Sequence, residues 1–271
     1  MTDAVRTEGR PRLAEVEHRY GERVHVFDNV LLQTALARLG GRRTSRKDVI
    51  LHLRTIYESM AMMMSTLEFP TKGASVETRM AEAYPKEGVV RGTFLDPKTR
   101  VVIVDVIRGG ILPAQFCFDL FESVLPEENV RLDHLNLARE VDEEGCVTGA
   151  NLSGSKVGGP IDGSILLIPD PMGATGSTII RVVEHYLADH GTPAKIIAMP
   201  MIATPEFFRA VLDANEQIRI YAGRIDRGLS SADVLATIPG TMWAQERGLS
   251  DTPYIVPGAG GVGEILNNSW C

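Results

Sequence analysis

The sequence predicts an α/β fold in which a mostly parallel sheet is flanked by helices. Two observations carry this prediction. Short apolar runs typical of buried parallel strands occur at residues 101–107, 165–168, 194–202 and 217–222. Segments with apolar residues at helical spacing alternate with these runs, and such alternation implies a parallel sheet with helices on both faces.

Composition and charge exclude several classes of protein. The chain has 271 residues, of which 44% are hydrophobic and 23% are charged, values ordinary for a globular protein. The net charge of −7 argues against a nucleic-acid partner bound through a basic surface. No apolar run is long enough to span a bilayer, and the charged N-terminus lacks the apolar core of a secretory signal, so we expect no membrane partner. The three cysteines lie far apart, which suggests reduced thiols in a cytoplasmic protein.

The chain begins with residues 1–23, which are polar and weakly patterned, and we expect a mobile N-terminal arm there. A single domain over 24–271 follows, and it opens with a helical segment. Asp28 is placed to cap the first helix, which should stop at the glycine pair that begins with Gly40.

A longer helix is predicted over 46–67. Ser45 and Asp48 give it a capping-box-like start, and apolar residues then recur at helical spacing. Its methionine cluster indicates a packed helix or a subunit interface more than a flexible binding groove. Two short strands, around 75–80 and 89–94, are expected in the loop-rich stretch that follows.

The buried run at 101–107 is followed by Arg108, Gly109 and Gly110, and then by a predicted helix over 111–124. Small residues at a strand end allow close approach of a ligand, and a guanidinium there can fork onto a diphosphate. The alternative is a surface arginine at an ordinary turn.

A strand predicted at 130–137 leads into a polar, glycine-rich stretch. We expect this stretch, 138–163, to form a β-arm or flap. Arg139 lies at its beginning, where a flap of this kind joins the sheet.

The most informative stretch is SILLIPDPMGATGST at 164–178. An apolar strand ends near Asp170, a loop of small residues follows, and a helix begins after it. The first N–H groups of a helix lack intrahelical partners and favour an anion, so this arrangement predicts a phosphate site. Asp170 would repel a phosphate and therefore suits sugar hydroxyls. The loop lacks the lysine of G-x-x-x-x-G-K-[ST] and is not G-x-G-x-x-G. The alternative is an ordinary strand-to-helix turn.

Later elements complete the alternation of strands and helices. Thr204 as N-cap and Pro205 at the first position predict a helix between the last two apolar runs. The six histidines are scattered and none has the spacing of metal ligands. We therefore predict no metal site built by the side chains.

Four stretches together resemble one enzyme family. DPMGATGST at 170–178 resembles the phosphate loop DPMLATGGS of the uracil phosphoribosyltransferases. In the same order along the chain, VIRGG (106–110) is similar to the family's ILRAG, IDRGL (225–229) to IDxGL, and YIVPGAGGVGE (254–264) to YIVPGLGDAGD. The resemblance covers roughly 24–266 and implies the type I phosphoribosyltransferase fold.

The resemblance implies transfer of a phosphoribosyl group from 5-phosphoribosyl 1-diphosphate (PRPP) to uracil, giving UMP and diphosphate in pyrimidine salvage. Asp170 and Arg108 would be catalytic, with Asp170 on the ribose hydroxyls and Arg108, with Arg139, on the diphosphate. The residues implied to bind PRPP are Arg108, Gly109, Arg139, Asp170, Met172, Gly173, Ala174, Thr175, Gly176, Ser177 and Thr178. Those implied to bind the base are Tyr254, Ile255, Pro257, Gly260, Gly261 and Val262.

The family also implies a cofactor and partners. Mg²⁺ would arrive on PRPP, because Pro169 stands where many relatives outside this branch carry the first of two acids. Relatives associate in pairs, so we expect a homodimer whose other partners are PRPP and a nucleobase.

Four departures from the family pattern leave the substrate open. Gly261 and Glu264 stand where the family has aspartates, Gly173 replaces a leucine, and residues 231–252 are an insertion near the base pocket. One alternative is therefore a phosphoribosyltransferase for a different heterocyclic base. Another is a non-catalytic regulator that binds a nucleotide or a ribose phosphate.

Overall fold

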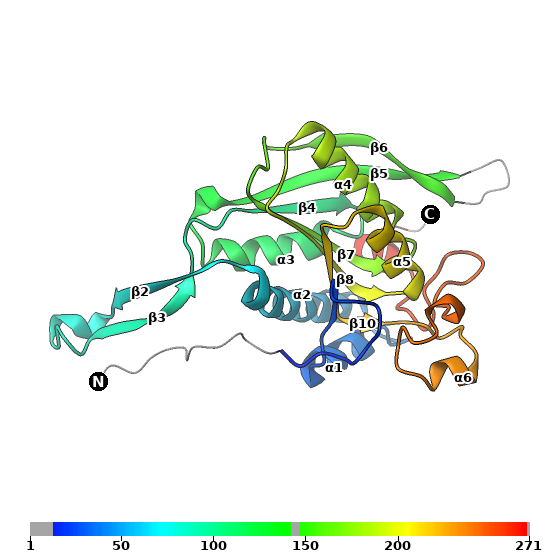
Figure 1. The fold of residues 1–271 in the computed structure, drawn as a ribbon, viewed down its shortest axis with the longest axis horizontal. Coiled ribbons are helices and arrows are strands. Elements are labelled where there is room, and N and C mark those ends of the chain that lie inside the picture. Colours follow the sequence, from blue (N-terminus) through cyan, green and yellow to red (C-terminus); the bar gives the residue numbers. More distant parts are fainter. Residues whose placement is uncertain (1–12, 142–146, 270–271) are drawn as a thin grey trace.

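The computed structural model describes residues 13–141 and 147–269 (Figure 1). Their main feature is an eight-stranded sheet with the strand order β1-β9-β8-β7-β4-β5-β6 and with β10 beside β8. Within the described chain, every pair in this sheet is parallel except β5 with β6. The strands are β1 (Val24–Val26), β4 (Val101–Ile107), β5 (Val130–Val141), β6 (Val147–Lys156), β7 (Ile165–Gly173), β8 (Lys195–Ala203), β9 (Ile218–Ala222) and β10 (Arg224–Ile225).

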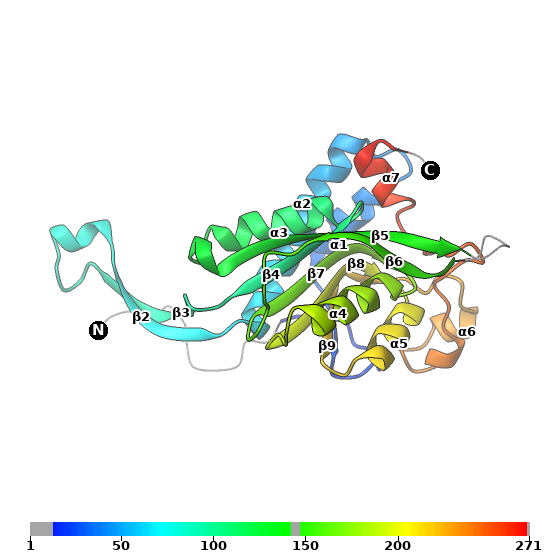
Figure 2. The ribbon, with the colours of Figure 1, turned by 90° about the horizontal axis from the view of Figure 1, so that it is seen from above.

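Helices cover both faces of this sheet (Figure 2). Within β4, Val101 and Ile103 pack in one apolar core and Val102 and Val104 in the other, because successive strand residues point to opposite faces. The predicted fold class is therefore confirmed. The first core contains residues of α1 (Val30–Leu39), α2 (Arg46–Glu68), α3 (Ile111–Glu122) and the short α7 (Val262–Asn267), and the second contains residues of α4 (Ser177–Asp189) and α5 (Pro205–Ala214).

Side-chain oxygens cap the starts of several helices. Ser45 caps α2 and Thr204 caps α5, as the sequence predicts. The prediction for α1 is wrong by one residue: Asn29, not Asp28, accepts the N–H of Leu32 at 3.0 Å. The helix begins at residue 30, so the N-cap position falls on the asparagine.

The methionine-rich part of α2 is mostly interior. Met60 and Met64 are fully buried in the first core, whereas Met62 is 54% exposed. The apolar character of this helix is therefore largely used by packing within its own chain.

Residues 13–23, which the sequence places in a mobile arm, lie against the body of the protein. The Val16 N–H donates to the Val26 carbonyl at 2.9 Å. Tyr20 is 3% exposed, and its hydroxyl donates to the Glu246 carboxylate at 2.5 Å. An apolar ring with a buried acceptor for its hydroxyl fixes this segment, which hydropathy alone does not reveal. The rest of the expected arm, 1–12, lies outside the described residues.

Two antiparallel ribbons extend from the structure (Figures 1 and 2). The first pairs β5 with β6, from His134 opposite Lys156 to Val141 opposite Val147, and overlaps part of the β-arm expected over 138–163; residues 142–146 lie outside the described residues. The second pairs β2 (Thr71–Glu77) with β3 (Val89–Leu95) and carries the short helix η1 (Arg79–Glu82) at its tip. Every residue of β2 is exposed. The sequence predicts two short strands here but not an arm.

A buried carboxylate ties α2 to the sheet. Glu68, the last residue of α2, is 2% exposed, and its carboxylate accepts hydrogen bonds from Lys195 at 2.7 Å, Arg219 at 2.9 Å and the Tyr221 hydroxyl at 2.5 Å. Burial acts to raise the pKa of Glu68. The hydrogen bonds from Lys195 and Tyr221 and the charges of Lys195 and Arg219 outweigh it and bring the pKa below the ordinary value of 4.5.

The stability that Glu68 contributes should be present above pH 4.5 and should be lost as the pH falls through its lower folded-state pKa. Glu68→Gln should lower the free energy of unfolding at neutral pH by about 1–3 kcal/mol. It should also flatten the dependence of that free energy on pH in the acid range, which urea unfolding at a series of pH values measures. As a control, Glu58→Gln on the same helix removes only an exposed pair with Arg54 and should change little. Parallel pH profiles for wild type and Glu68→Gln would contradict this account.

Candidate functional site

Three loops meet at the carboxyl edge of the sheet, where open α/β folds place their ligands. We name them the Arg108 loop (108–110, after β4), the Asp170 loop (170–176, at the end of β7) and the Gly258 loop (254–261, before α7). A Cβ atom built on Gly109 would lie 3.3 Å from Cγ of Pro171, and one built on Gly263 would lie 3.8 Å from Cα of Gly109. The second contact joins the Arg108 loop to the first turn of α7, which directly follows the Gly258 loop.

The strand that carries the Asp170 loop is longer than predicted. The apolar run predicts an end near Asp170, but β7 continues to Gly173, with Asp170 opposite Pro200 and Gly173 opposite Ala203 of β8. Directly after β8, the Thr204 N–H donates to the Gly173 carbonyl at 3.0 Å. Parallel pairing with β8 thus extends the strand past Pro169 and Pro171, and it holds the loop against the sheet edge.

Close packing explains two glycines of this loop. A Cβ atom at Gly173 would lie 3.0 Å from Cβ of Pro200, so the leucine of relatives has no room here. Gly176 adopts φ +84° just before α4, and a Cβ there would lie 2.8 Å from a methyl group of Val211. Both the left-handed backbone conformation and the lack of room for a side chain therefore require glycine at position 176.

The start of α4 presents several hydrogen-bond donors. The hydroxyl oxygens of Thr175 and Ser177 lie 3.1 Å apart. Ser177 and Thr178 are the first two residues of the helix, so their N–H groups have no partner within it. Hydroxyls and helix N–H groups together form a donor set suited to a phosphate.

Asp170 lies beside this donor set and is partly buried. Its Oδ1 accepts the Met172 N–H at 3.0 Å, which fixes the carboxylate at the strand end. Tyr57 of α2 lies close enough to feel its charge: burial, with the charge of Asp170, raises the pKa of Tyr57 well above its usual value. The Tyr57 hydroxyl therefore stays protonated behind the site.

Of the two arginines predicted to bind the diphosphate, Arg108 has a described side chain and Arg139 does not. Arg108 follows β4 directly, and its Nη1 donates to the Ser269 hydroxyl at 2.9 Å, which links it to the end of α7. The Ile107–Arg108 peptide bond is cis. Arg139 lies on β5 opposite Ala150 of β6, but its side chain lies outside the described residues. The Arg108 loop thus meets the Asp170 loop, while the position of the Arg139 guanidinium is not described.

The Gly258 loop and the start of α7 bury two apolar side chains, while Tyr254, Pro257 and Gly260 are exposed. Ile255 is 6% exposed and Val262, the first residue of α7, is 1% exposed, and both belong to the first core. Tyr254 is 53% exposed at the loop's start. The Val256–Pro257 peptide bond is cis, and Gly258 and Gly260 have φ values of +61° and +72°. The exposed Gly260 has no side chain, so at this position the loop can offer only main-chain N–H and C=O groups to a ligand.

An ion pair that the sequence patterns do not predict lies against this loop. Arg224 forks onto Asp226, with Nε 2.6 Å from Oδ1 and Nη2 2.8 Å from Oδ2. Asp226 Oδ2 also accepts the Gly258 N–H at 2.6 Å, and Arg224 Nη2 donates to the Gly258 carbonyl at 3.1 Å. The signal in the sequence is a carboxylate directly after a short strand, within the IDRGL motif.

The insertion at 231–252 packs beside the Gly258 loop. It contains α6 (Ala232–Leu235) and a short helix, η3 (Trp243–Gln245). Its anchor is Glu246, 4% exposed, whose Oε1 accepts hydrogen bonds from Arg227 at 2.9 Å and the Gly240 N–H at 2.8 Å. At its end, the Gly248 carbonyl accepts the Val256 N–H at 2.8 Å. The insertion therefore reaches the backbone of the loop directly.

The glycine at 261 also has a structural explanation. A Cβ atom built there would overlap an oxygen of the Glu264 carboxylate. Glu264, in the first turn of α7, thus fills the space that a side chain at position 261 would enter. An acid remains next to the Gly258 loop, although it is supplied from a different residue.

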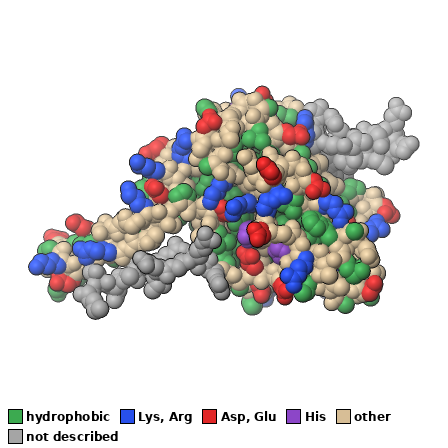
Figure 3. Space-filling view, in the orientation of Figure 1, with side chains coloured by type: hydrophobic (Ala, Val, Ile, Leu, Met, Phe, Trp, Pro, Cys, Tyr) green, Lys and Arg blue, Asp and Glu red, His purple; other side chains and the backbone are tan. Residues whose placement is uncertain are grey.

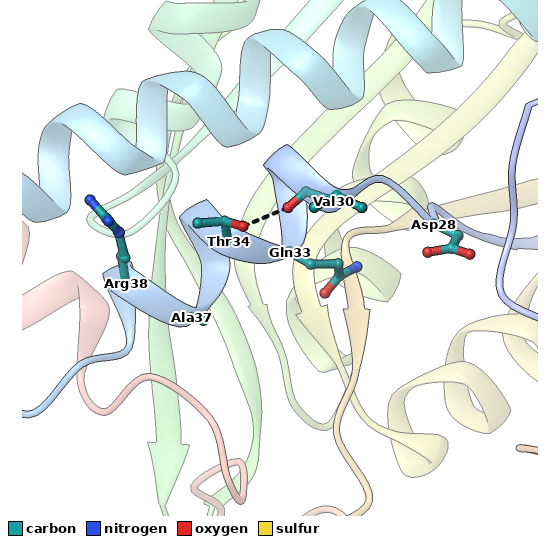
Figure 4. Close-up of a pocket in the computed structure, with 6 residues that line it drawn as sticks. All are labelled: Asp28, Val30, Gln33, Thr34, Ala37 and Arg38. Atoms are coloured by element: carbon teal, nitrogen blue, oxygen red, sulfur yellow. Dashed lines mark hydrogen bonds between the residues drawn. The ribbon is translucent and has the colours of Figure 1, made fainter.

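Two surface hollows lie elsewhere, along α1 and the start of α2. Neither is lined by residues of the three loops. Their lining residues are Asp28, Val30, Gln33, Thr34, Ala37 and Arg38 in the first (Figure 4), and Arg38, Gly41, Arg42, Arg43, Thr44, Asp48, Leu51 and His52 in the second.

Comparisons with known proteins agree with the geometry. A family model described as uracil phosphoribosyltransferase matches residues 26–244. The chain is 26% identical over 245 residues to the uracil phosphoribosyltransferase of Dictyoglomus thermophilum, covering 90% of this chain and 98% of that one. It is 27% identical over 246 residues to that of Pyrobaculum islandicum, covering 89% and 97%. The solved structure of the AQ2163 protein from Aquifex aeolicus is similar in fold, with a TM-score of 0.67 at 20% identity, covering 90% and 97%.

Proposed function

Because this chain belongs to the uracil phosphoribosyltransferase family, we propose that it transfers the phosphoribosyl group of PRPP to uracil and releases UMP and diphosphate. The observation that carries the proposal is the meeting of the Arg108, Asp170 and Gly258 loops at one sheet edge. PRPP and uracil need a phosphate site, an acceptor for sugar hydroxyls, a cation and a base pocket within one ligand length. These three loops supply that combination.

The proposed roles follow the chemistry of each group. Ser177, Thr178 and the N–H groups at the start of α4 bind the 5′-phosphate, and the Asp170 carboxylate accepts from the ribose hydroxyls. The bond from C1 to the base nitrogen forms as the bond from C1 to the diphosphate oxygen breaks. Arg108 balances the charge that gathers on the departing diphosphate, with Arg139 of the β5–β6 ribbon as a second cation. Holding both reactants in line supplies much of the rate enhancement.

Mg²⁺ is proposed to enter with PRPP. Its usual ligands at phosphate sites are substrate oxygens, waters and one or two carboxylates, and Asp170 provides one such carboxylate beside the phosphate donors. When bound, the ion would neutralise part of the diphosphate charge. Among the described residues no group of three His, Cys, Asp or Glu side chains is placed to hold a metal ion.

A different heterocycle is the alternative substrate, and two observations favour it. The family model match ends at residue 244, before the Gly258 loop. The insertion at 231–252 hydrogen-bonds to that loop through Gly248. The part of the site that selects the base is therefore the part least covered by the family match.

A panel of nucleobases incubated with PRPP and Mg²⁺ tests the function through release of diphosphate and formation of UMP. We expect the largest kcat/KM with uracil.

Asp170→Asn should weaken PRPP binding roughly 10–100-fold, because charge-assisted hydrogen bonds to the ribose are lost. The matched control is Asp96→Asn, since Asp96 Oδ1 accepts the Lys98 N–H at the same 3.0 Å and spacing but lies far from the site. A faster reaction with another base would replace uracil, and no diphosphate release with any base would refute the enzyme.

Gly261→Asp, which restores the family's residue type, should lower kcat/KM several-fold here. The new carboxylate would meet that of Glu264, and like charges at one position repel. The double variant Gly261→Asp with Glu264→Gln should recover most of the loss, as a double-mutant cycle would measure. An increase in activity for Gly261→Asp alone would show that the Glu264 carboxylate does not occupy this space in the working enzyme.

We also propose a homodimer held by the β2–β3 ribbon. Val76, Met80 and Tyr84 are 52%, 56% and 55% exposed on it, so large apolar groups face solvent away from the body. At the tip of this ribbon, charged side chains of both signs lie among apolar ones (Figure 3). A second copy related by a two-fold axis would cover both ribbons at once.

Sedimentation of wild type should give a dimer mass, and Met80→Glu with Tyr84→Glu should shift it toward monomer. The reason is that two carboxylates would have to be desolvated at the apolar contact. Val124→Glu, at a 59% exposed site at the end of α3, serves as the control and should remain dimeric. A monomer at all concentrations of wild type would remove the ribbon from this role.

The compartment is a further proposal. Cys117 is buried and unpaired in the described part of the chain, which supports a reducing, cytoplasmic location. No helix among the described residues is both long and apolar enough to cross a membrane.

A further inference from the structure

The ion pair beneath the Gly258 loop is more enclosed than a surface pair. The side chains of Arg224 and Asp226 are 24% and 1% exposed. A buried carboxylate that lost its cation would be strongly disfavoured, so the two side chains hold each other in one geometry. This geometry is bidentate, which fixes direction as well as distance.

The pair holds both main-chain polar groups of one residue. Asp226 accepts the Gly258 N–H at 2.6 Å, and Arg224 donates to the Gly258 carbonyl at 3.1 Å. Gly258 has φ +61°, and a Cβ atom there would overlap the Ile255 carbonyl oxygen. The peptide planes on either side of Gly258 are therefore locked by one charged fork.

A second pair of contacts fixes the loop two residues earlier. The Gly228 N–H donates to the Val256 carbonyl at 3.0 Å, and the Val256 N–H donates to the Gly248 carbonyl at 2.8 Å. Residues 224–228 thus hold the loop at two points, and the insertion holds it at a third. The N–H and C=O groups of Val256 and Gly258 are therefore all fixed by hydrogen bonds.

We propose that Arg224 and Asp226 are positioning residues for nucleobase recognition, acting through the Gly258 turn. The inference rests on the proposed function, in which the Gly258 loop binds the base through its backbone. Backbone donors and acceptors discriminate between bases only when their directions are fixed, and a small displacement weakens every hydrogen bond to the base. The hydrogen bonds of the fork run to the Gly258 turn and not to Arg108 or the start of α4, so we expect PRPP binding to change less than uracil binding.

Steady-state kinetics with both substrates varied test the proposal. Arg224→Met keeps the apolar stem and removes the fork, and it should raise the KM for uracil roughly tenfold or more. The KM for PRPP should stay within about twofold. Arg224→Lys keeps the charge without the fork and should fall between wild type and Arg224→Met.

The chain contains a matched control. Arg131 forks onto Asp133 with side-chain exposures of 28% and 1%, and that pair holds the Gly158 N–H at 2.9 Å and the Gly159 carbonyl at 3.0 Å. It lies before β7, at the opposite end of the strand from the site. Arg131→Met should lower stability in the same way as Arg224→Met, yet leave the KM for uracil within about twofold.

The possible results distinguish a failure of the proposed function from a failure of the inference on Arg224 and Asp226 alone. If wild type makes no UMP, the proposed function fails and this inference falls with it. If wild type is active but Arg224→Met and Arg131→Met change the KM for uracil equally, or if the KM for PRPP rises as much as that for uracil, only the inference is overturned. Hydrogen exchange of wild type gives a test that needs no variant: the Gly258 amide should be protected, and rapid exchange there would overturn the fork.

Discussion

Parallel pairing of β4, β7 and β8 is the constraint on which the rest of the structure depends. It brings the carboxyl ends of these three strands to one edge, so the Arg108 and Asp170 loops meet although they lie far apart in the sequence. It also requires apolar side chains on both faces of each strand, which the alternation of Val101 and Val102 between the two cores satisfies. The site is thus a product of the sheet's direction, and the loops need only supply the chemical groups.

Buried carboxylates perform a second task in this fold. Glu68, Asp133, Asp226 and Glu246 are each nearly inaccessible, and each is paired with an arginine. The pairs tie down four segments that hydrophobic packing alone would leave loosely placed: the end of α2, the loop before β7, the Gly258 loop and the insertion. A directional fork specifies one arrangement of such segments, whereas apolar contact tolerates several.

Much of this architecture can be predicted from the sequence, and the features that cannot be predicted have physical reasons. The strand at 101–107 and the helix caps Ser45 and Thr204 follow from local patterns. A strand buried on both faces is a continuous apolar run, and an unpaired N–H at the start of a helix is commonly capped by Ser or Thr. The extension of β7 to Gly173 depends on a neighbour, β8, that local pattern does not include. The Arg224–Asp226 fork joins residues two apart to a glycine far along the chain, and no periodicity records such a contact.

The order of the sheet has a consequence for how the chain is made. β1 is the first strand to leave the ribosome, yet its partner is β9, with Val24 beside Ile220 and Val26 beside Ala222. The first strand must therefore wait, unpaired, while nearly all of the domain is synthesised. Contacts this distant in sequence slow folding and leave an open edge in the meantime. This edge of the sheet can therefore close only after β9 has been synthesised.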